Sequence, residues 1–206
     1  MQIVVLANEV LKEELLAGGP PSADIIWVSG PEEFSAYPGA DAFIDLLFEP
    51  LPQRIGQLEA LLPRPVLVNS VEKIADPRAS SFTRFNGWPT LLSAPLVEAF
   101  AIESLRCFAE KVMVHFHKQV EWLPDEQGFV TARVISMIIN EAYHSLEEGV
   151  SSRADMDTAM KLGTNYPYGP FEWAGKIGLP GIISLLQKMS ESQAHYRPSS
   201  QMLREK

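Results

Sequence analysis

The sequence predicts an α/β domain with a parallel sheet, followed by an all-α domain. In the first half of the chain, short apolar runs alternate with helical stretches, which is typical of strands that helices cover on both faces. After about residue 125 the strand signals end, and apolar residues recur at helical spacing. We therefore predict an α/β domain at residues 1–124, a helical domain at residues 125–190 and a loosely held polar tail at residues 191–206.

The α/β domain is predicted to alternate strands with helices. Short apolar runs rich in β-branched residues indicate strands at residues 2–6, 24–28, 42–47 and 65–69. Amphipathic stretches indicate helices at residues 8–17 and 53–62. The connection over residues 94–117 is expected to be helical, and a last strand is expected at residues 119–123.

Caps and periodicity together predict the helical domain. A helix over residues 129–148 ends at Gly149, and a second helix starts at the capping box Ser152-Arg-Ala-Asp155 and ends at Gly163. The first helix carries an apolar stripe, interpreted as core and dimer seam, of Val130, Val134, Ile138, Ala142 and Leu146. Two more helices follow, each with a proline suited to its first turn, Pro170 and Pro180.

Composition and charge narrow the class of partner. A net charge of −9 and a pI near 5.0 argue against nucleic acid, which needs clustered Lys and Arg. The apolar runs are too short to span a bilayer, so no membrane partner is expected. Residues 1–7 have no basic start and are interpreted as a strand, and the single Cys107 fits a reducing compartment. We therefore expect a cytoplasmic protein.

Six motifs follow one another in the second half of the chain. They are Gly128-Phe-Val-Thr-Ala-Arg133, Asn140-Glu-Ala, Leu146-Glu-Glu-Gly-Val150, Asp155-Met-Asp157, Ala159-Met-Lys-Leu-Gly163 and Tyr166-Pro-Tyr-Gly-Pro-Phe-Glu172. In order and spacing they resemble the C-terminal domain of 3-hydroxyacyl-CoA dehydrogenases. Upstream, a weaker resemblance to the Rossmann domain of that family is carried by Ala40-Asp-Ala-Phe-Ile-Asp45, Val66-Leu-Val-Asn-Ser70 and Leu96-Val-Glu98.

The resemblance implies a reduced Rossmann-like sheet domain and a helical domain through which the family dimerises, so a homodimer is expected. It also implies oxidation of the 3-hydroxyl of an acyl-CoA with NAD, in fatty-acid metabolism, by a histidine–glutamate pair. Glu98 matches the glutamate, and Asn69 and Ser70 match a polar pair near the substrate. Tyr166 and Phe171 are interpreted chiefly as core or dimer contacts, while the resemblance also places them near the cleft that would hold the acyl chain.

The dinucleotide-binding features of the family are missing. A pyrophosphate needs glycines after the first strand, so that backbone amides can approach it. This chain has Ala7-Asn-Glu-Val-Leu-Lys12 there, and Glu9 would face the phosphates. After the second strand, where the family carries an acidic residue for the ribose, it has Ser29-Gly30. No cofactor is therefore expected, and NAD is implied by the family alone.

The catalytic histidine of the family is missing as well. The Gly-x-His-Phe-Phe-Asn-Pro segment aligns with Gly87-Trp-Pro-Thr-Leu-Leu-Ser-Ala-Pro95, which puts the histidine position at Pro89. The base's contribution, about 10²–10⁴-fold, is then lost. In the long helix, Ala132 replaces an asparagine of the family.

Three functions remain open. The first is an acyl-CoA-binding or repurposed homologue without NAD-dependent catalysis. The second is an active dehydrogenase with a non-standard base or a partner that supplies the cofactor site. The third is a structural or regulatory dimer partner of a full-length paralogue.

Other constellations favour no further chemistry. Glu141 and His144 share a helix face at a metal-binding spacing, but a di-metal bundle needs a second copy of the motif. His115 and His117 are interpreted as a polar cluster at a helix end, so no metal is expected. The sequence also lacks Gly-x-Ser-x-Gly, P-loop and Cys-x-x-Cys motifs.

Overall fold

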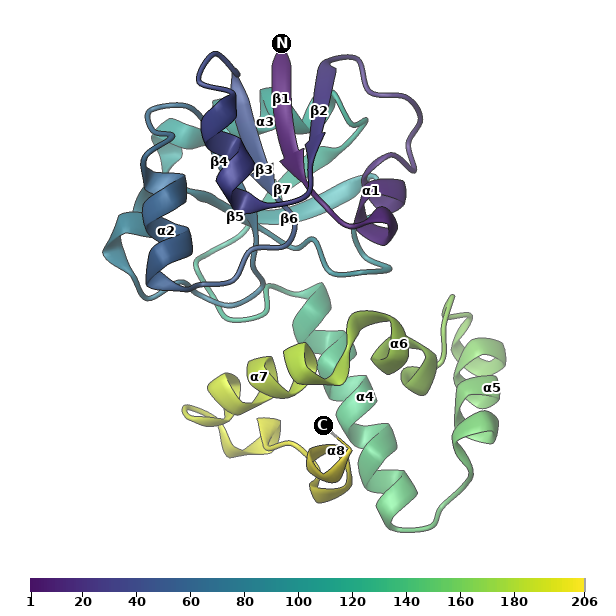
Figure 1. The fold of residues 1–206 in the computed structure, drawn as a ribbon. Coiled ribbons are helices and arrows are strands. Elements are labelled where there is room, and N and C mark those ends of the chain that lie inside the picture. Colours follow the sequence, from purple (N-terminus) through teal and green to yellow (C-terminus); the bar gives the residue numbers. More distant parts are fainter. Residues whose placement is uncertain (206) are drawn as a thin grey trace. The chain divides into compact units, whose positions relative to one another are not determined.

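The computed structural model describes residues 1–205, which form two compact units (Figure 1). The first, Met1–Phe129, is an α/β unit, and the second begins at Val130 and is helical, as the sequence predicts. The sequence places the boundary after residue 124. The structure places it after Phe129, because the intervening residues are hydrogen-bonded to the first unit.

The first unit is built on one seven-stranded sheet with the strand order β2-β1-β3-β4-β5-β6-β7 (Figure 1). The strands are β1 (Gln2–Leu6), β2 (Asp24–Val28), β3 (Ala42–Asp45), β4 (Val66–Asn69), β5 (Thr83–Phe85), β6 (Leu96–Phe100) and β7 (Gln119–Trp122). Neighbouring strands are parallel except β5 and β6, which pair antiparallel. The expected parallel sheet is therefore confirmed, with one reversed pair.

Both faces of the sheet are covered. The covering elements are the α-helices α1 (Glu9–Leu15), α2 (Pro52–Glu59) and α3 (Glu103–Val114) and the 3₁₀ helices η1 (Pro31–Ala36) and η2 (Pro77–Ser81). In β1, Ile3 and Val5 pack in the cluster that contains residues of α1 and α3, whereas Val4 and Leu6 pack in the cluster that contains residues of α2. Burial on both faces explains why this strand is a continuous apolar run.

The predicted helix over residues 94–117 is wrong in its first part. Residues 96–100 form strand β6, and only Glu103–Val114 are helical. Within β6, Val97 and Ala99 are buried while Leu96 is exposed, so side chains alternate between faces with the period of a strand. This alternation lies directly before an amphipathic helix, which conceals it in the sequence.

The second unit contains the four longer helices that were predicted. They are α4 (Thr131–Glu147), α5 (Arg153–Thr164), α6 (Pro170–Ile177) and α7 (Leu179–Ser190). Ser152 caps α5 by accepting the Asp155 N–H, as predicted, but the left-handed residue after this helix is Asn165 and not Gly163. Among residues 1–205, no helix combines the length and the apolar character needed to cross a membrane.

The tail predicted at residues 191–206 is not loosely held over its described part, residues 191–205. These residues form η3 (Ala194–Tyr196) and α8 (Ser200–Arg204), which pack within the helical unit. Met202 is fully buried, and the Asn140 side chain accepts the Ser199 N–H and donates to the Arg197 carbonyl. Buried Tyr196 and Met202, together with the Asn140 amide, anchor a segment whose composition is mostly polar.

Candidate functional site

The predicted polar residues of the first unit gather around one turn. Strands β4 and β5 are parallel, so Asn69 at the end of β4 and the Asn86–Gly87 turn after β5 lie at the same edge of the sheet. Strand β6 runs back along β5, and the Asn86 N–H donates to the Glu98 carbonyl at 2.9 Å. Asn69 and Glu98, which the sequence assigned to one site, therefore contact consecutive residues of this turn.

The side-chain amide of Asn69 is hydrogen-bonded to backbone groups of the protein. Its Nδ2 group donates to the Leu46 and Gly87 carbonyls, each at 3.0 Å, and its Oδ1 accepts the Gly87 N–H at 2.9 Å. Both donor hydrogens are thus bonded to backbone, and a ligand would have to bond to the remaining lone pair of Oδ1 or displace a carbonyl. Asn69 is a brace for the turn as well as a candidate ligand-binding residue.

Glu98 and Ser70 are half-buried and also have partners. The Asn86 side chain donates to Glu98 Oε2 at 3.1 Å and accepts the Trp88 N–H, so this buried amide orients the carboxylate. The Ser70 hydroxyl donates to the Glu72 carbonyl at 2.8 Å. The sequence alone does not single out Asn86, because no local pattern pairs it with a residue on the next strand.

Tyr166 and Phe171 belong to the helical unit and pack there. The Tyr166 ring lies against Trp173 with a centroid distance of 5.5 Å, and the Phe171 ring lies edge-on to Tyr143 at 5.1 Å. The Arg153 guanidinium lies 4.9 Å from the Phe171 centroid. These contacts support the structural interpretation of the segment, and they leave its predicted role in acyl-chain binding a proposal.

The turn after β1 does not fit a pyrophosphate. Asn8 caps α1, its Oδ1 accepting the Leu11 N–H at 2.9 Å, and Glu9 occupies the first helical turn. A dinucleotide site needs free amides and a close backbone approach at this point, and a carboxylate in the first turn opposes an anion. The segment from Ala7 to Lys12 has no glycine for a close backbone approach, and its first-turn carboxylate opposes the phosphates.

The amides after β2 are engaged as well. The N–H groups of Ser29 and Gly30 both donate to Glu33 Oε1 at 2.9 Å, so η1 begins with its own carboxylate cap. Beside this turn lies a cavity of about 380 Å³, lined by residues that include Leu6, Glu32 and Glu49. A crevice therefore persists at the carboxyl ends of β1 and β3, but two of its lining side chains are acidic.

A buried ion pair lies at this crevice. Arg54 of α2, which lines the cavity, donates through Nε to Asp45 Oδ2 at 2.7 Å, and Asp45 is fully buried at the end of β3. Burial raises the pKa of the Asp45 carboxyl, and the hydrogen bond from Arg54 opposes this shift. The guanidinium thus pairs with a carboxylate at the end of an interior strand, and removing either partner would leave a buried charge unpaired.

The loop that aligns with the catalytic segment of the family is tied down on both sides. Glu14 of α1 accepts the Thr90 N–H through both carboxylate oxygens, at 2.7 and 2.9 Å. Buried Lys118 donates to the Leu92 and Ala94 carbonyls, and burial lowers the pKa of its ammonium group. Thr90 has a left-handed backbone, with φ of 73°. No imidazole occurs in this loop, so a proton acceptor would have to come from elsewhere.

The four histidines do not form a metal site. His117 Nε2 lies 2.8 Å from the Pro20 carbonyl oxygen and His115 Nδ1 lies 2.7 Å from Ser22 Oγ, so this pair fastens the loop between α1 and β2. Over the described chain, residues 1–205, no group of three His, Cys, Asp or Glu side chains could hold a metal ion.

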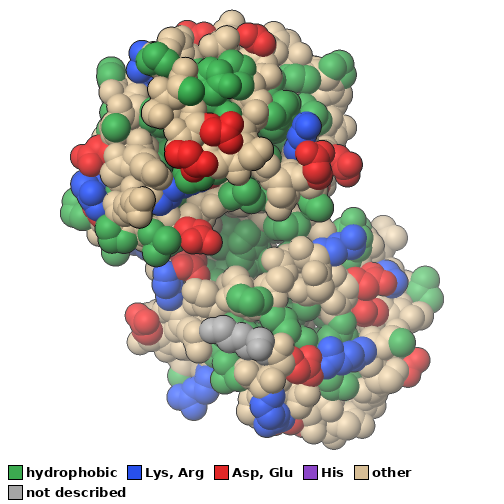
Figure 2. All heavy atoms as spheres, in the orientation of Figure 1, with side chains coloured by type: hydrophobic (Ala, Val, Ile, Leu, Met, Phe, Trp, Pro, Cys, Tyr) green, Lys and Arg blue, Asp and Glu red, His purple; other side chains and the backbone are tan. Residues whose placement is uncertain are grey.

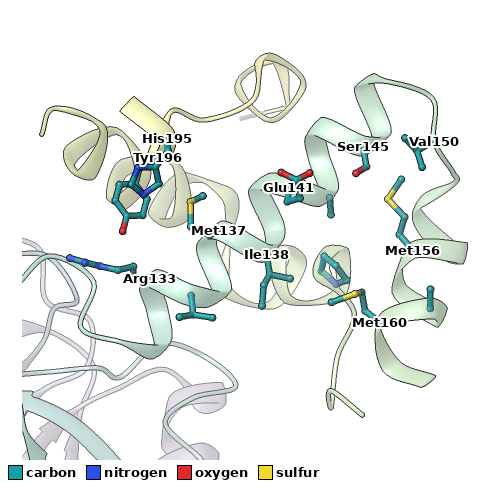
Figure 3. A pocket seen from close by; sticks show the side chains of 14 residues that line it. Arg133, Met137, Ile138, Glu141, Ser145, Val150, Met156, Met160, His195 and Tyr196 are labelled. Atoms are coloured by element: carbon teal, nitrogen blue, oxygen red, sulfur yellow. The ribbon is translucent and has the colours of Figure 1, made fainter. Parts of the chain in front are cut away.

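The helical unit carries an apolar groove, here called the α4 groove, of about 620 Å³. Figure 3 shows its lining side chains on α4, α5 and η3, among them Met137, Ile138, Met156 and Met160, and Val134 of α4 also lines it. Much of the stripe predicted for α4 lies here: Val134 is 49% exposed, and the core face of the helix is formed instead by Ile135, Ile139 and Tyr143. Polar atoms at the groove come from Arg133, Glu141, Ser145 and His195 (Figure 3).

Comparison with known proteins identifies the relatives of the chain. Residues 128–206 match the family model of the 3-hydroxyacyl-CoA dehydrogenase C-terminal domain. The chain is 44% identical over 85 residues to 3-hydroxyadipyl-CoA dehydrogenase of Escherichia coli, covering 40% of this chain and 18% of the relative. It is 32% identical over 153 residues to 3-hydroxybutyryl-CoA dehydrogenase of Bradyrhizobium diazoefficiens, covering 67% of this chain and 52% of the relative.

The likeness to solved structures extends over both units. The crystal structure of FadB2 from M. tuberculosis aligns with a TM-score of 0.75 at 16% identity, over 98% of this chain and 92% of that chain. The fold is therefore of the Rossmann type with a C-terminal helical domain. The matches cover about half of the Bradyrhizobium relative and less of the Escherichia coli one. With the helical domain matched at motif level and the sheet domain matched in fold, the chain belongs to the 3-hydroxyacyl-CoA dehydrogenase family.

Proposed function

We propose that the protein binds an acyl-CoA thioester without catalysing NAD-dependent oxidation of a 3-hydroxyl group. The observation that carries this proposal is the turn after β1, where Asn8 caps a helix of seven residues and Glu9 lies in its first turn. This turn has no glycine to let a pyrophosphate approach the backbone, and the Glu9 carboxylate, which pairs with Lys12, opposes an anion. The loop around Pro89, held by Glu14 and Lys118, supplies no general base in place of the missing histidine.

Thioester binding is proposed because the sheet domain retains polar residues at positions that the family uses near its substrate. Asn69, Ser70 and Glu98 match family positions near the substrate, and the turn at Asn86 connects Asn69 with Glu98. The net charge of −9 means that anionic coenzyme A would need local basic or amide groups. On the face drawn in Figure 2, Lys and Arg side chains are scattered among acidic and apolar ones.

Isothermal titration tests the proposal. Acetoacetyl-CoA, CoA alone and NADH are titrated separately into the purified chain. We expect heat of binding from acetoacetyl-CoA and none from NADH, and no loss of NADH absorbance when all components are mixed at high protein concentration. Absence of heat from acetoacetyl-CoA contradicts thioester binding. Oxidation of NADH in proportion to protein concentration would establish the active dehydrogenase instead.

A pair of serine variants tests the site. Ser70→Ala removes the hydroxyl at the predicted ligand site, whereas Ser80→Ala removes an exposed hydroxyl in η2. We expect Ser70→Ala to weaken acetoacetyl-CoA binding by about tenfold, the usual effect of one lost hydrogen bond of about 1.4 kcal/mol. Ser80→Ala should bind like the wild type. Equal affinities of all three proteins would show that the thioester binds elsewhere.

The α4 groove favours a second function, that of a dimerising subunit. A solvent-exposed apolar groove on a helical unit is typical of a surface that another chain covers. The groove is lined by one positive and one negative side chain, Arg133 and Glu141, so two copies of this surface could pair opposite charges. We propose a homodimer through this groove. A full-length paralogue that presents the same helices could take the place of the second copy.

A further inference from the structure

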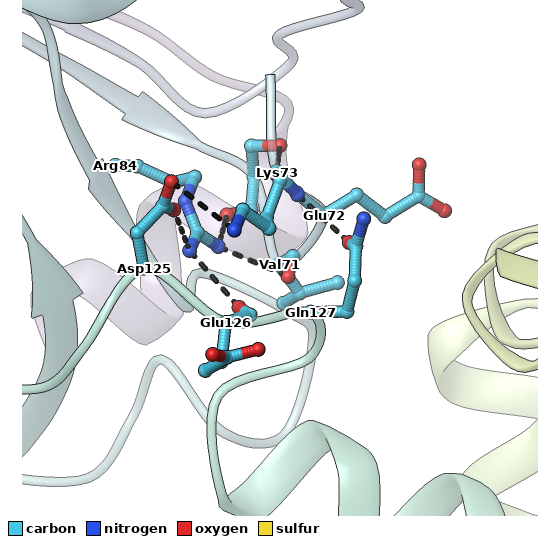
Figure 4. A network of polar contacts seen from close by, with 8 residues as sticks. Val71, Glu72, Lys73, Arg84, Asp125, Glu126 and Gln127 are labelled. Atoms are coloured by element: carbon cyan, nitrogen blue, oxygen red, sulfur yellow. Dashed lines mark hydrogen bonds and ion pairs between the residues drawn. The ribbon is translucent and has the colours of Figure 1, made fainter. Parts of the chain in front are cut away.

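Arg84 lies at the centre of a polar network that joins two distant segments of the first unit (Figure 4). It belongs to β5, and its side chain is only 4% exposed. One segment is the loop 70–73 after β4, and the other is the linker 124–129, which precedes the helical unit in the chain. Neither segment belongs to a helix or a strand.

The guanidinium donates in two directions. Its Nη1 group donates to the Val71 carbonyl at 3.0 Å and to the Ser70 carbonyl at 3.3 Å. Its Nη2 group donates to Asp125 Oδ1 at 2.8 Å and to the Glu126 carbonyl at 3.0 Å. Such a planar group with fixed donor directions can satisfy four acceptors on two segments at once, which a single ammonium cannot.

Contacts between the two segments reinforce this arrangement. The Gly128 N–H donates to the Val71 carbonyl at 2.7 Å, and the Lys73 N–H donates to Gln127 Oε1 at 2.8 Å. The Lys73 ammonium lies 3.6 Å from Asp125, so this carboxylate is shared by two cations (Figure 4). The segments are thus held to each other as well as to Arg84.

The linker is held in an unusual backbone conformation. Gly128 and Phe129 have φ values of 78° and 48°, both in the left-handed region, and the second of these residues is not a glycine. The Phe129 ring is buried, and the Arg84 guanidinium lies over it at 4.2 Å from the ring centroid. The left-handed backbone is unfavourable for phenylalanine, and this stacking contact stabilises Phe129 in that conformation.

We propose that Arg84 is a clasp that fastens the linker 124–129 to the loop 70–73, so that the two segments are ordered together and are released together. Through the Ser70 carbonyl, the clasp also positions the loop that carries the Ser70 hydroxyl. Arg84 is therefore a positioning residue, and its effect on the conformation of these segments requires no ligand.

Amide hydrogen exchange measured by NMR tests the clasp, because each segment contains an amide that bonds to the other. We expect Arg84→Gln to raise the exchange rates of the Lys73 and Gly128 amides together, by at least about tenfold. The Val68 amide in β4 should stay protected. The control is Arg78→Gln, because Arg78 bonds to Asp76 and Pro52 and to neither segment.

A second variant covers the case in which Arg84→Gln does not fold. Asp125→Asn removes the charge that Arg84 and Lys73 share at a partly exposed side chain, and Asp76→Asn is its matched control. Faster exchange in both segments of Asp125→Asn, and in neither segment of Asp76→Asn, supports the clasp. Unchanged exchange, a change in one segment alone, or an equal change in Val68 overturns it.

Ligand binding gives a separate measurement that rests on the proposed function. If the wild type binds acetoacetyl-CoA, the clasp predicts about tenfold weaker binding by Asp125→Asn, because the Ser70 loop is released. Full affinity in that variant would contradict the positioning of Ser70. A wild type that binds no thioester contradicts the proposed function, and the exchange rates of Lys73 and Gly128 then decide the clasp alone.

Discussion

Gly87 is the residue on which the polar turn after β5 depends. Its N–H and its carbonyl are both bonded to the side chain of Asn69, and this close approach leaves no room for a methyl group. A Cβ atom at this position would lie 2.8 Å from Asn69 Cγ and 3.0 Å from the Phe85 ring. The missing side chain therefore lets the ends of β4 and β5 share one amide.

Replacing Gly87 with alanine should destabilise the protein. The added methyl group forces Asn69 away from the turn, and we expect the free energy of unfolding to fall by about 1–3 kcal/mol, as for other overpacked sites. Urea unfolding at neutral pH measures this change. Gly39→Ala is the control, because no atom lies within 4 Å of its added Cβ. A similar loss of stability in both variants would contradict the role of Gly87.

At the scale of single residues, the sequence singled out candidate site residues but not the contacts between them. Glu98, Asn69 and Ser70 were proposed because they lie in short motifs that resemble those of a family, and their role in binding stays a prediction. Asn86 and Arg84 were missed because their partners lie 12 and 41 residues away, at Glu98 and Asp125. These contacts form only when β4, β5 and β6 lie side by side in the folded sheet, so no local sequence pattern predicts them.

The junction between α5 and α6 shows how one element fixes its neighbour. Glu172, in the first turn of α6, forms an ion pair with Lys161 of α5 and accepts the Gly169 N–H at 3.0 Å. Asp157 of α5 accepts the Phe171 N–H at 2.8 Å. Two carboxylates thus hold the start of α6 against α5, and they satisfy amides that a helix N-terminus leaves free.

This junction should depend on pH. Lys161, and secondarily the Gly169 N–H, lower the pKa of Glu172 below its ordinary value of 4.5. Stability from a lowered carboxyl pKa is fully present above that ordinary value and is lost as the pH falls through the lower, folded-state pKa. The difference in unfolding free energy between wild type and Glu172→Gln should therefore be largest at neutral pH and shrink below pH 4.5.

Urea unfolding at a series of pH values measures this difference. Glu148→Gln, at an exposed position just after α4, is the control and should change stability little at any pH. The prediction is wrong if wild type and Glu172→Gln differ equally at pH 3.5 and pH 7, two conditions that lie about 1 unit below and well above the ordinary glutamate pKa.

At the scale of elements, strong local signals were the reliable ones. Strands β1 to β4 are apolar runs, and α5 and α6 begin at a serine cap and a proline, so each was predicted near its true position. Strand β5 has three residues and includes a buried arginine, which no hydropathy pattern reveals. Helix α8 has five residues and is ordered by its contacts with α4, as buried Met202 shows.

At the scale of the whole molecule, α4 has two apolar faces, and the predicted stripe lies mostly on the face outside the core. Ile135, Ile139 and Tyr143 face the core of the helical unit, while Val134 and Ile138 line the α4 groove. A single chain therefore leaves one apolar face of its longest described helix in contact with water. Covering that face with a second copy would bury it without any change of fold.

Light scattering after size-exclusion chromatography tests the dimer. We expect the wild type at micromolar concentration to have twice the chain mass of 22.9 kDa. Val134→Glu places a carboxylate in the α4 groove and should yield the single-chain mass, because burying an unpaired charge is unfavourable. Circular dichroism should show that this variant keeps its helices, since Val134 is half-exposed in the single chain.

Val114→Glu separates this groove from exposed apolar residues in general. Val114 is 60% exposed on α3 of the first unit, so the same substitution adds the same charge away from the helical unit. This variant should keep the dimer mass. A monomeric wild type would contradict the homodimer, and mixing it with a full-length paralogue would then show whether the α4 groove is covered by that chain instead. Dissociation of Val114→Glu would place the interface on the sheet domain, because that is the unit α3 belongs to.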